Sequence, residues 1–488
     1  MPITQQARLL AQLLQGPDSQ REQAISGVTC RVERVQPGMV FAAVEEFLAY
    51  QQWQHGLAHL SEAVRRGAGA VITPRASEDL ALSQLVVPEP RRVYGTLCRA
   101  FWGAPDQVLR LIGVTGTNGK STTAQLIAHL YQHTLGRAGS IGTLGTYLNG
   151  QRIEAGVYTT PLAEDGYRLL ARLRNLHADA VAMEVSSHGL ALERVAGMKF
   201  SAAVFLNLGR DHLDFHGTPE AYLEAKLRLF QQLPVRCPAI VNADDPAWQT
   251  FAHAAKGPVL RYGIKNRRAE VRAIFINLSA RETTFTLAYQ GQRYPARMRL
   301  LGRFMVSNAL AAIATLLAYG AKPEALLRAL ASFRPLPGRM EAFPLPNGAT
   351  AIVDYAHNPD GLERLLENVR AFDPRQLLLV FGAGGDRDKG KRPLMGEIAA
   401  RYADRIWISN DNPRTEEPEA IAQAIRRGVG PHPATTLQLD RAAAIREAYA
   451  SSQPGDVLVL AGKGHEDYMQ IGTRKLPYSD IAVVKALR

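Results

Sequence analysis

The sequence has few cysteines, few lysines and no long apolar stretch. Its three cysteines lie far apart and show no metal-ligand spacing, so reduced thiols are expected rather than a disulfide framework. No apolar run approaches the roughly 18 residues that a membrane-spanning helix needs. The first residues, Met1 to Gln5, lack the basic and apolar pattern of an export signal. We therefore expect a cytoplasmic protein without membrane insertion.

Lysine is scarce although the chain is basic. Of its 57 basic residues 11 are lysine and 46 are arginine, and no lysine precedes Lys120. A chain that uses arginine almost everywhere has kept lysine where a guanidinium cannot substitute. Five lysines fall in the motifs described below, namely Lys120, Lys226, Lys389, Lys391 and Lys463. The net charge of +12 comes without a basic run, which favours a polyanionic small substrate over nucleic acid.

The chain length and the alternation of apolar strands with helices predict an α/β protein of three domains, since single hydrophobic cores stop growing near roughly 250–300 residues. Residues 1–105 form a small N-terminal α/β domain, beginning with a helix over Leu9 to Leu14. Residues 106–336 alternate strands with helices, which indicates a doubly wound parallel sheet of the P-loop type. Residues 337–488 repeat that alternation as a Rossmann-like C-terminal domain, after a Pro/Gly cluster at Pro335 to Gly338.

The central domain opens with a phosphate-binding pattern. An apolar strand ending at Val114 leads into Gly116-Thr-Asn-Gly-Lys-Ser121, and a helix is expected from Thr122 to Tyr131. Strand, glycine loop and helix in this order are typical of a nucleotide site. Glycines let the backbone wrap the phosphates, Lys120 neutralises them and Ser121 holds Mg²⁺. The strict consensus has glycine where this chain has Val114.

Carboxylates and imidazoles follow two further strands. Glu184 ends an otherwise apolar strand, where an unpaired charge is costly, so we expect it to bind Mg²⁺. A Ser186–His188 hydrolase pair is excluded, because the glycines of a nucleophile elbow are missing. Asp211, His212, Asp214 and His216 come just after the strand Ala202 to Leu206. This clustering suits a metal or phosphate site.

These segments resemble the Mur ligase family, which builds the peptidoglycan stem peptide. The matches are the loop Gly-Thr-Asn-Gly-Lys-Ser, the pattern Asn-x-x-x-Asp-His-Leu-Asp-x-His from Asn207, Ala-Lys-x-x-Leu-Phe around Lys226, and Pro337 to Glu341. The resemblance implies that Lys226 is carbamylated, which needs an amine that can lose its proton. It also implies catalysis by Lys120, Lys226 and His212. The implied metal ligands are Ser121, Glu184, His212 and Lys226, and the implied ATP contacts are Gly116, Thr117, Asn118, Gly119, Lys120, Ser121, Asn308, Arg339, Asp354 and His357.

The family's nucleotide-sugar contacts are matched less completely. The resemblance assigns UDP-MurNAc-L-Ala-D-Glu to Cys30, Arg31, Thr159, Thr160, Ser186 and Arg194. Several positions depart from the family pattern, namely Thr29 and Cys30 for Asp-Ser, Tyr158 for Asn, Leu192 for Gln and Met305 for Asn. We therefore expect a changed contact set in the first domain, with backbone groups and Arg31 binding the uridine diphosphate.

Three stretches of the last domain resemble the branch of the family that adds meso-diaminopimelate. They are the loop from Gly384 to Pro393, Asp411-Asn-Pro-Arg414 and Gly462-Lys-Gly-His-Glu466. Arg387 and Arg414 can bind the distal carboxylate bidentately, while Asp411 and Glu466 can hold the ammonium. The implied amino-acid site consists of Arg387, Asp411, Asn412, Arg414, Gly462 and Glu466.

The implied reaction is ATP-dependent amide formation through an acyl phosphate, by a monomer that needs ATP and Mg²⁺. The alternatives are the same chemistry with L-lysine or L-ornithine, and a ligase like folylpolyglutamate synthase. From another class, the chain could be a P-loop ATPase or a regulatory nucleotide-binding module. ADP release that depends on an added amine distinguishes the ligases from these.

Overall fold

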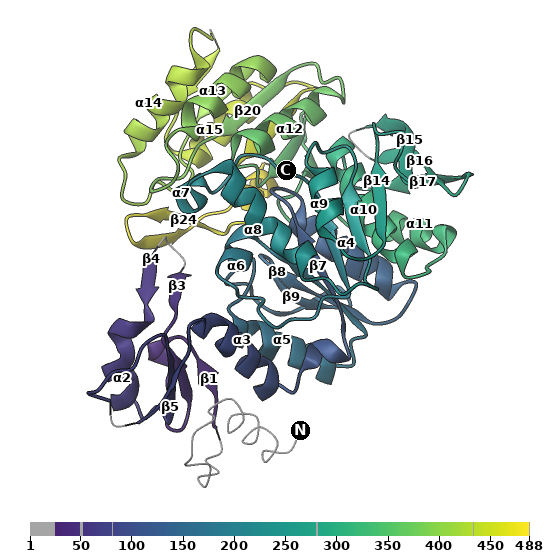
Figure 1. Ribbon diagram of the computed structural model, residues 1–488. Helices are drawn as coiled ribbons and strands as arrows, with labels where there is room; N and C mark the ends of the chain where they lie inside the picture. The colour runs from purple at the N-terminus through teal and green to yellow at the C-terminus, as the bar shows by residue number, and fades with distance from the viewer. Residues whose placement is uncertain (1–24, 49–51, 81, 280–281, 433, 488) are drawn as a thin grey trace.

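The computed structural model describes residues 25–48, 52–80, 82–279, 282–432 and 434–487 (Figure 1). The helix expected over Leu9 to Leu14 lies outside these ranges. The three larger sheets of the described residues fall one each within residues 1–105, 106–336 and 337–488, and the hairpins β3–β4 and β24–β25 form two small sheets besides. This is the α/β architecture predicted above, while the limits between the domains stay predictions. Among the described residues, no helix has the length and apolar content needed to cross a bilayer.

The first domain, purple in Figure 1, contains a parallel four-stranded sheet in the order β1-β2-β5-β6. A β3–β4 hairpin extends from it toward the C-terminal hairpin β24–β25. The elements are β1 (Val28–Thr29), η1 (Val32–Arg34), β2 (Val40–Ala42), β3 (Glu45–Leu48), β4 (Gln52–His55), η2 (Gly56–His59), α2 (Leu60–Arg65), β5 (Ala70–Thr73), β6 (Ser83–Val86), α3 (Pro90–Phe101) and η3 (Pro105–Gln107).

The central sheet has the order β10-β9-β8-β11-β7-β12-β13-β14-β15-β16-β17. In the part of this order that runs from β8 to β15, each strand is parallel to its neighbours. Two more strands are added in antiparallel orientation at each edge, β9 and β10 beyond β8, and β16 and β17 beyond β15. Its strands are β7 (Arg110–Thr115), β8 (Ala138–Gly142), β9 (Gly145–Leu148), β10 (Gln151–Glu154), β11 (Ala180–Glu184), β12 (Ala202–Phe205), β13 (Ala239–Asn242), β14 (Val259–Gly263), β15 (Val271–Leu278), β16 (Thr283–Tyr289) and β17 (Gln292–Met298). Its helices are α4 (Lys120–Gln132), α5 (Ala163–Asn175), α6 (Ser187–Ala191), α7 (Leu213–His216), α8 (Pro219–Gln231), α9 (Trp248–Ala254), α10 (Arg303–Ala318) and α11 (Pro323–Ser332).

Helices cover both faces of this sheet, which explains its continuous apolar strands. Successive side chains of β7 point to opposite faces of the sheet, so Ile112 packs in the core that α4 and α10 share. Leu111 instead packs in the core under α5 and α8. The phosphate-binding loop, Glu184 and the segment from Asn207 therefore lie at the carboxyl ends of the neighbouring parallel strands β7, β11 and β12.

The third domain, green to yellow in Figure 1, has a sheet in the order β18-β19-β23-β20-β21-β22, parallel except for β18. Its elements are β18 (Glu341–Pro344), β19 (Thr350–Asp354), α12 (Pro359–Arg370), β20 (Leu377–Phe381), α13 (Lys391–Tyr402), β21 (Arg405–Ile408), α14 (Pro418–Val429), β22 (Thr435–Leu437), α15 (Arg441–Ala450), β23 (Val457–Ala461), β24 (Tyr468–Ile471), β25 (Arg474–Pro477) and α16 (Asp480–Ala486).

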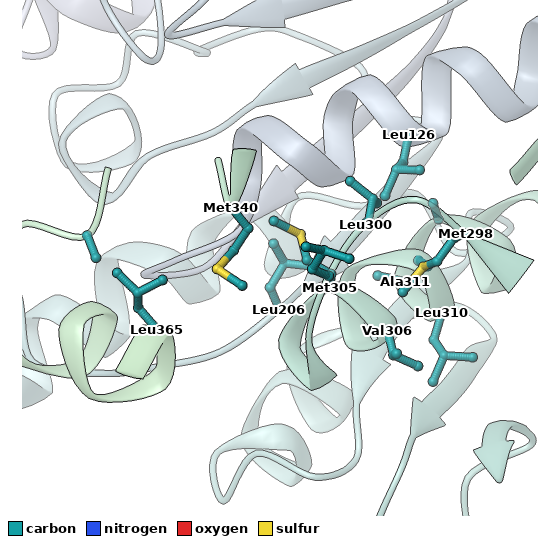
Figure 2. Close-up of a cluster of buried hydrophobic side chains, with 14 of the residues drawn as sticks. Leu126, Leu206, Met298, Leu300, Met305, Val306, Leu310, Ala311, Met340 and Leu365 are labelled. Atoms are coloured by element: carbon teal, nitrogen blue, oxygen red, sulfur yellow. The ribbon is translucent and has the colours of Figure 1, made fainter. Parts of the chain in front are cut away.

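An apolar cluster joins the second and third domains. Met305 of α10 is buried beside Leu206, which follows β12 (Figure 2). Met340 and Leu365 belong to the third domain and lie in the same cluster. Met305, which replaces the family's asparagine, is thus part of the packing that connects the two domains.

Candidate active site

The phosphate-binding loop joins β7 to α4 as predicted. Gly119 has a φ of 92°, and a Cβ there would lie 2.5 Å from Asn308 Oδ1, so only glycine fits this close approach. Lys120 Nζ donates to the loop oxygens of Gly116 and Thr117 at 2.7 and 2.9 Å. Its burial lowers the pKa of Lys120, against the opposing effect of Glu184. The loop therefore holds the Lys120 amine at its centre by two backbone oxygens.

Glu184 forms the corner of a candidate metal site. Its side chain is 3% exposed, and Ser121 Oγ donates to Oε2 at 3.0 Å. The Thr143 backbone N–H donates to Oε1 at 2.9 Å, a contact that sequence reasoning missed. Burial raises the pKa of Glu184. A carboxylate beside two hydroxyls fits Mg²⁺ that takes its other ligands from phosphate and water.

Thr143 reaches Glu184 through the order of the strands, which no short sequence pattern signals. It directly follows β8, which pairs with β11. Its hydroxyl lies 3.3 Å from Glu184 Oε2 and 3.0 Å from Thr159 Oγ1. The metal corner and the expected nucleotide-sugar contacts are thus connected through hydroxyl groups.

Lys226 is buried under the phosphate-binding loop. It is 1% exposed, its Nζ donates to the Gly116 oxygen at 3.1 Å, and it lies 4.3 Å from the Tyr222 ring centroid. Burial, reinforced by the charge of Lys120, lowers the pKa of Lys226 well below its usual value. The amine is therefore held toward its neutral form, which is the form that reacts with CO₂.

Asp211 lies where the central and third domains meet. Asn358 Nδ2 donates to its Oδ2 at 3.3 Å. Burial opposes ionisation, but the positive charges of His212, His357, Lys391 and Lys120 hold the pKa of Asp211 at about 2. His212 has a left-handed φ of 54°, and its ring centroid lies 4.5 Å from that of His188. The Asp211 carboxylate therefore sits among lysines and imidazoles at this junction.

A nucleotide pocket of about 470 Å³ opens between α10 and the third domain. Residues from both domains line it, including Asn118, Gly119, Asn308, Arg339 and Asp354. Asp354 accepts hydrogen bonds from the N–H groups of Met340 and Ala356, both at 2.8 Å. Arg339 Nε is buried and has no hydrogen-bond partner among the described residues. An unpaired guanidinium N–H in this pocket suits a phosphate.

A second cavity, of about 490 Å³, adjoins the nucleotide pocket and shares Tyr355 with it. Its central-domain end is lined by Thr159, Thr160, Ser186 and Arg194. Thr160 Oγ1 lies 3.0 Å from Ser186 Oγ. His357, which the resemblance assigned to ATP, also lines this cavity, while the nucleotide pocket lacks it among its described lining residues.

The other end of this cavity brings together all six residues expected to bind the amino acid, namely Arg387, Asp411, Asn412, Arg414, Gly462 and Glu466. Burial, followed by the charge of Arg414, lowers the pKa of Arg387. Within the described chain, Arg414 Nε is buried without a hydrogen-bond partner. Two guanidinium groups that repel each other and leave an N–H unpaired favour a carboxylate between them.

Lys463 binds two of the residues at this end of the cavity, a role that sequence reasoning did not assign. It is fully buried, and its Nζ lies 2.8 Å from Glu466 Oε2 and 3.0 Å from Asn412 Oδ1. Asn412 Nδ2 also donates to Glu466 Oε2 at 2.8 Å. Glu466 therefore already has one cationic partner, and Asp411 supplies the additional negative charge.

The first-domain residues expected to bind the nucleotide-sugar lie elsewhere. Cys30 is buried, and its N–H donates to Glu164 Oε2 at 3.2 Å. Arg31 Nη2 lies 2.7 Å from Asp165 Oδ2. Both carboxylates belong to the first turn of α5, where the helix dipole favours negative charge. In this structure Cys30 and Arg31 fasten the first domain to the central one. Neither residue lines the cavity of about 490 Å³, which is called the large cavity below.

Comparison with known proteins agrees with this geometry. Residues 114–316 match the Mur ligase middle domain, and residues 338–464 match the Mur ligase glutamate ligase domain. The UDP-N-acetylmuramoyl-L-alanyl-D-glutamate–2,6-diaminopimelate ligases of Alkalilimnicola ehrlichii and Synechococcus elongatus are 40% and 41% identical to this chain. Each alignment covers 96% of the chain and 95% of the relative.

Solved structures give the same result. A structure of a ligase of that name has a TM-score of 0.68 and 34% identity, with 95% of each chain covered. A Mycobacterium tuberculosis folylpolyglutamate synthase has a TM-score of 0.65 at 19% identity, covering 76% of this chain and 92% of that one, which shows a shared fold alone. From its domains, its relatives and its structure, the chain belongs to the Mur ligase family.

Proposed function

We propose that this protein uses ATP to join meso-diaminopimelate to the D-Glu of UDP-MurNAc-L-Ala-D-Glu. The observation that carries the proposal is the cavity end where Arg387 and Arg414 lie close to Asp411 and Glu466. An amino-acid end needs both a carboxylate site and an ammonium site. The names of the relatives support the same substrates.

In the proposed reaction the γ-carboxylate of D-Glu attacks the γ-phosphorus of ATP. The bond from that phosphorus to the bridging oxygen breaks, and ADP leaves with the electron pair. The amine then attacks the acyl phosphate, loses a proton and expels phosphate. Lys120 neutralises charge on the transferring group, and Arg339 binds the nucleotide phosphates with its unpaired N–H.

Mg²⁺ would be held by Glu184 and Ser121, and would supply charge neutralisation at the phosphates. His212 and carbamylated Lys226 would complete the metal site. The burial of Lys226 and its lowered pKa support this assignment. The carbamate would place an anion beside Lys120, where a protonated Lys226 would be repelled.

A substrate panel tests the proposal. Purified protein with ATP, Mg²⁺ and UDP-MurNAc-L-Ala-D-Glu is given meso-diaminopimelate, L-lysine, L-ornithine or L-glutamate, and ADP and the tripeptide product are measured. We expect sustained ADP release and product with meso-diaminopimelate. Sustained ADP release without any amino acid would instead indicate an ATPase, and activity only with folates and glutamate would indicate the folylpolyglutamate reaction.

A further inference from the structure

Lys391 is a cation to which the reaction described above assigns no role. It is the first residue of α13 and lines the large cavity. Its Nζ donates to the backbone oxygen of His357 at 2.8 Å, which holds the side chain against the segment that follows β19. The next residue, Arg392, is instead buried in an ion pair with Glu416. The two adjacent cations therefore have different surroundings, because Arg392 pairs with Glu416 whereas Lys391 lines the cavity.

The position of Lys391 within the cavity is informative. The nucleotide-sugar end is marked by Thr160 and Ser186, and the amino-acid end by Arg414. Lys391 lines the same cavity as Asp211, His212 and His357, and it lies within electrostatic reach of both Asp211, on the central-domain side, and Asp411, at the amino-acid end. A carboxyl group that is phosphorylated from one side and attacked by an amine from the other must lie between these two ends.

Two lysines from different domains lie near one carboxylate there. Asp211 and Lys391 line the same cavity, and the charge of Asp211 reaches both Lys391 of α13 and Lys120 of the phosphate-binding loop. Asp211 is held at the domain junction by its hydrogen bond from Asn358. A phosphoryl group that leaves ATP beside Lys120 thus moves into a region that Lys391 also reaches.

We propose that Lys391 is a further catalytic residue, which binds the phosphoryl group as it passes from ATP to the substrate carboxylate. This proposal rests on the proposed function. As the bond to ADP breaks and the new bond to the carboxylate oxygen forms, Lys391 neutralises charge on the acyl phosphate from the third-domain side. The N-terminal amides of α13 add partial positive charge. Because Lys391 belongs to the third domain, fast transfer requires that domain to be closed on the central one.

The sequence gives an independent reason to single out Lys391. It remains lysine directly before Arg392, in a chain with 46 arginines and 11 lysines. A compact ammonium on a flexible stem can follow a phosphoryl group that moves, whereas a planar guanidinium is suited to a fixed bidentate partner. Lys389 offers a matched control, because its side chain is 73% exposed and pairs with Glu416 outside the proposed contact.

The test isolates the first chemical step. Full-length protein is mixed with ATP, Mg²⁺ and UDP-MurNAc-L-Ala-D-Glu without amino acid, the single-turnover burst of ADP is followed by rapid quench, and acyl phosphate is trapped with hydroxylamine. We expect Lys391→Met to slow the burst by about 10²-fold, the usual effect of removing one charge-stabilising donor. Lys391→Arg should recover part of the rate, and Lys389→Met should match the wild type.

The outcomes separate this proposal from the function on which it rests. If the wild type gives no ADP burst and no hydroxamate, the proposed function fails. If the wild type reacts and Lys391→Met gives a normal burst with only a raised KM for the amino acid, Lys391 binds the amine and the proposal is overturned. An equal loss in Lys389→Met would also overturn it, by showing a general effect of the loop. Should Lys391→Met melt early, Lys391→Gln, which keeps a donor for the His357 oxygen, gives the same comparison.

Discussion

Ser121 Oγ lies 3.0 Å from Glu184 Oε2, although the two residues are 63 positions apart. They meet because β11 pairs in parallel with β7, with Glu184 opposite Val114. The hydroxyl of the phosphate-binding loop and the carboxylate at the next strand end therefore form one polar corner, where a divalent cation and ATP phosphates can meet.

Removing the charge of Glu184 should disable this corner. Glu184→Gln keeps the size of the side chain but loses an anionic ligand, so we expect activity to fall by about 10²-fold or more. The Mg²⁺ concentration for half-maximal activity should rise. Titration of ADP release against Mg²⁺ checks this, with the exposed Glu220→Gln as control. An unchanged Mg²⁺ dependence would contradict the metal assignment.

Replacing Lys226 should abolish activity in a way that an added acid reverses. Lys226→Ala and Lys226→Arg cannot form a carbamate, and we expect losses of about 10²-fold or more. Bicarbonate with a short-chain carboxylic acid should partly restore Lys226→Ala, because the acid supplies the missing carboxylate. The exposed Lys199→Ala serves as control. A bare amine at Lys226 in the mass spectrum of fully active protein would disprove the carbamate.

Arg31→Ala tests whether this arginine fastens two domains or binds nucleotide. Its ion pair with Asp165 is largely buried, with the two side chains 13% and 15% exposed. We expect a loss of about 2 kcal/mol in the free energy of unfolding. Asp165→Asn should destabilise as well, because Asp165 also pairs with Arg34, but the effects of the two changes should be less than additive. Denaturation of both single variants and the double variant measures this coupling. An unchanged stability with a tenfold or larger rise in the KM for UDP-MurNAc-L-Ala-D-Glu would restore the nucleotide role.

Arg414→Ala should remove the preference for an amino acid with a distal carboxylate. L-Lysine and L-ornithine leave the guanidinium pair unsatisfied, so the wild type should prefer meso-diaminopimelate by about 10⁴-fold in kcat/KM. Arg414→Ala should lose most activity and most of that ratio, while the exposed Arg427→Ala should keep both. Comparable wild-type turnover of L-lysine or L-ornithine would show that the arginines do not select the substrate.

The ion pair between Glu416 and Arg392 should make stability depend on acid pH. Hydrogen bonding by Arg392 lowers the pKa of Glu416 from 4.5 to about 2. A carboxylate with a depressed folded pKa stabilises the fold above its unfolded pKa, and this contribution is lost as pH falls from about 4.5 toward 2. Glu416→Gln should therefore differ most from the wild type above pH 5, with the difference shrinking below about 4.5. Chemical denaturation across this range is the measurement, and a pH-independent difference would contradict it.

Local patterns in the sequence were enough to predict much of the site. The helix expected over Thr122 to Tyr131 is observed as Lys120–Gln132, and the strand predicted at Ala70 to Thr73 has the same limits. The six residues expected to bind the amino acid all line one cavity. The six residues share this cavity because each of their motifs directly follows an apolar strand, and parallel strands place their carboxyl ends together. Their role in binding stays a prediction.

Partners that are distant in sequence could not be predicted in this way. Thr143 reaches Glu184 only because β8 lies beside β11, and no short pattern encodes that strand order. Arg31 was assigned to a nucleotide by its motif, yet it lies against Asp165 of α5. A side chain's role depends on which charged group comes within a few ångströms of it after folding.

The sequence by itself therefore determined the α/β class, the phosphate-binding loop and the chemical character of each end of the site. Only the tertiary structure decided that Lys463 compensates Glu466, that Arg31 fastens two domains and that Lys391 lies within reach of both Asp211 and Asp411. The reason is physical. Backbone conformation near a motif depends on neighbours along the chain, whereas burial and charge pairing depend on elements that the chain brings together from far apart.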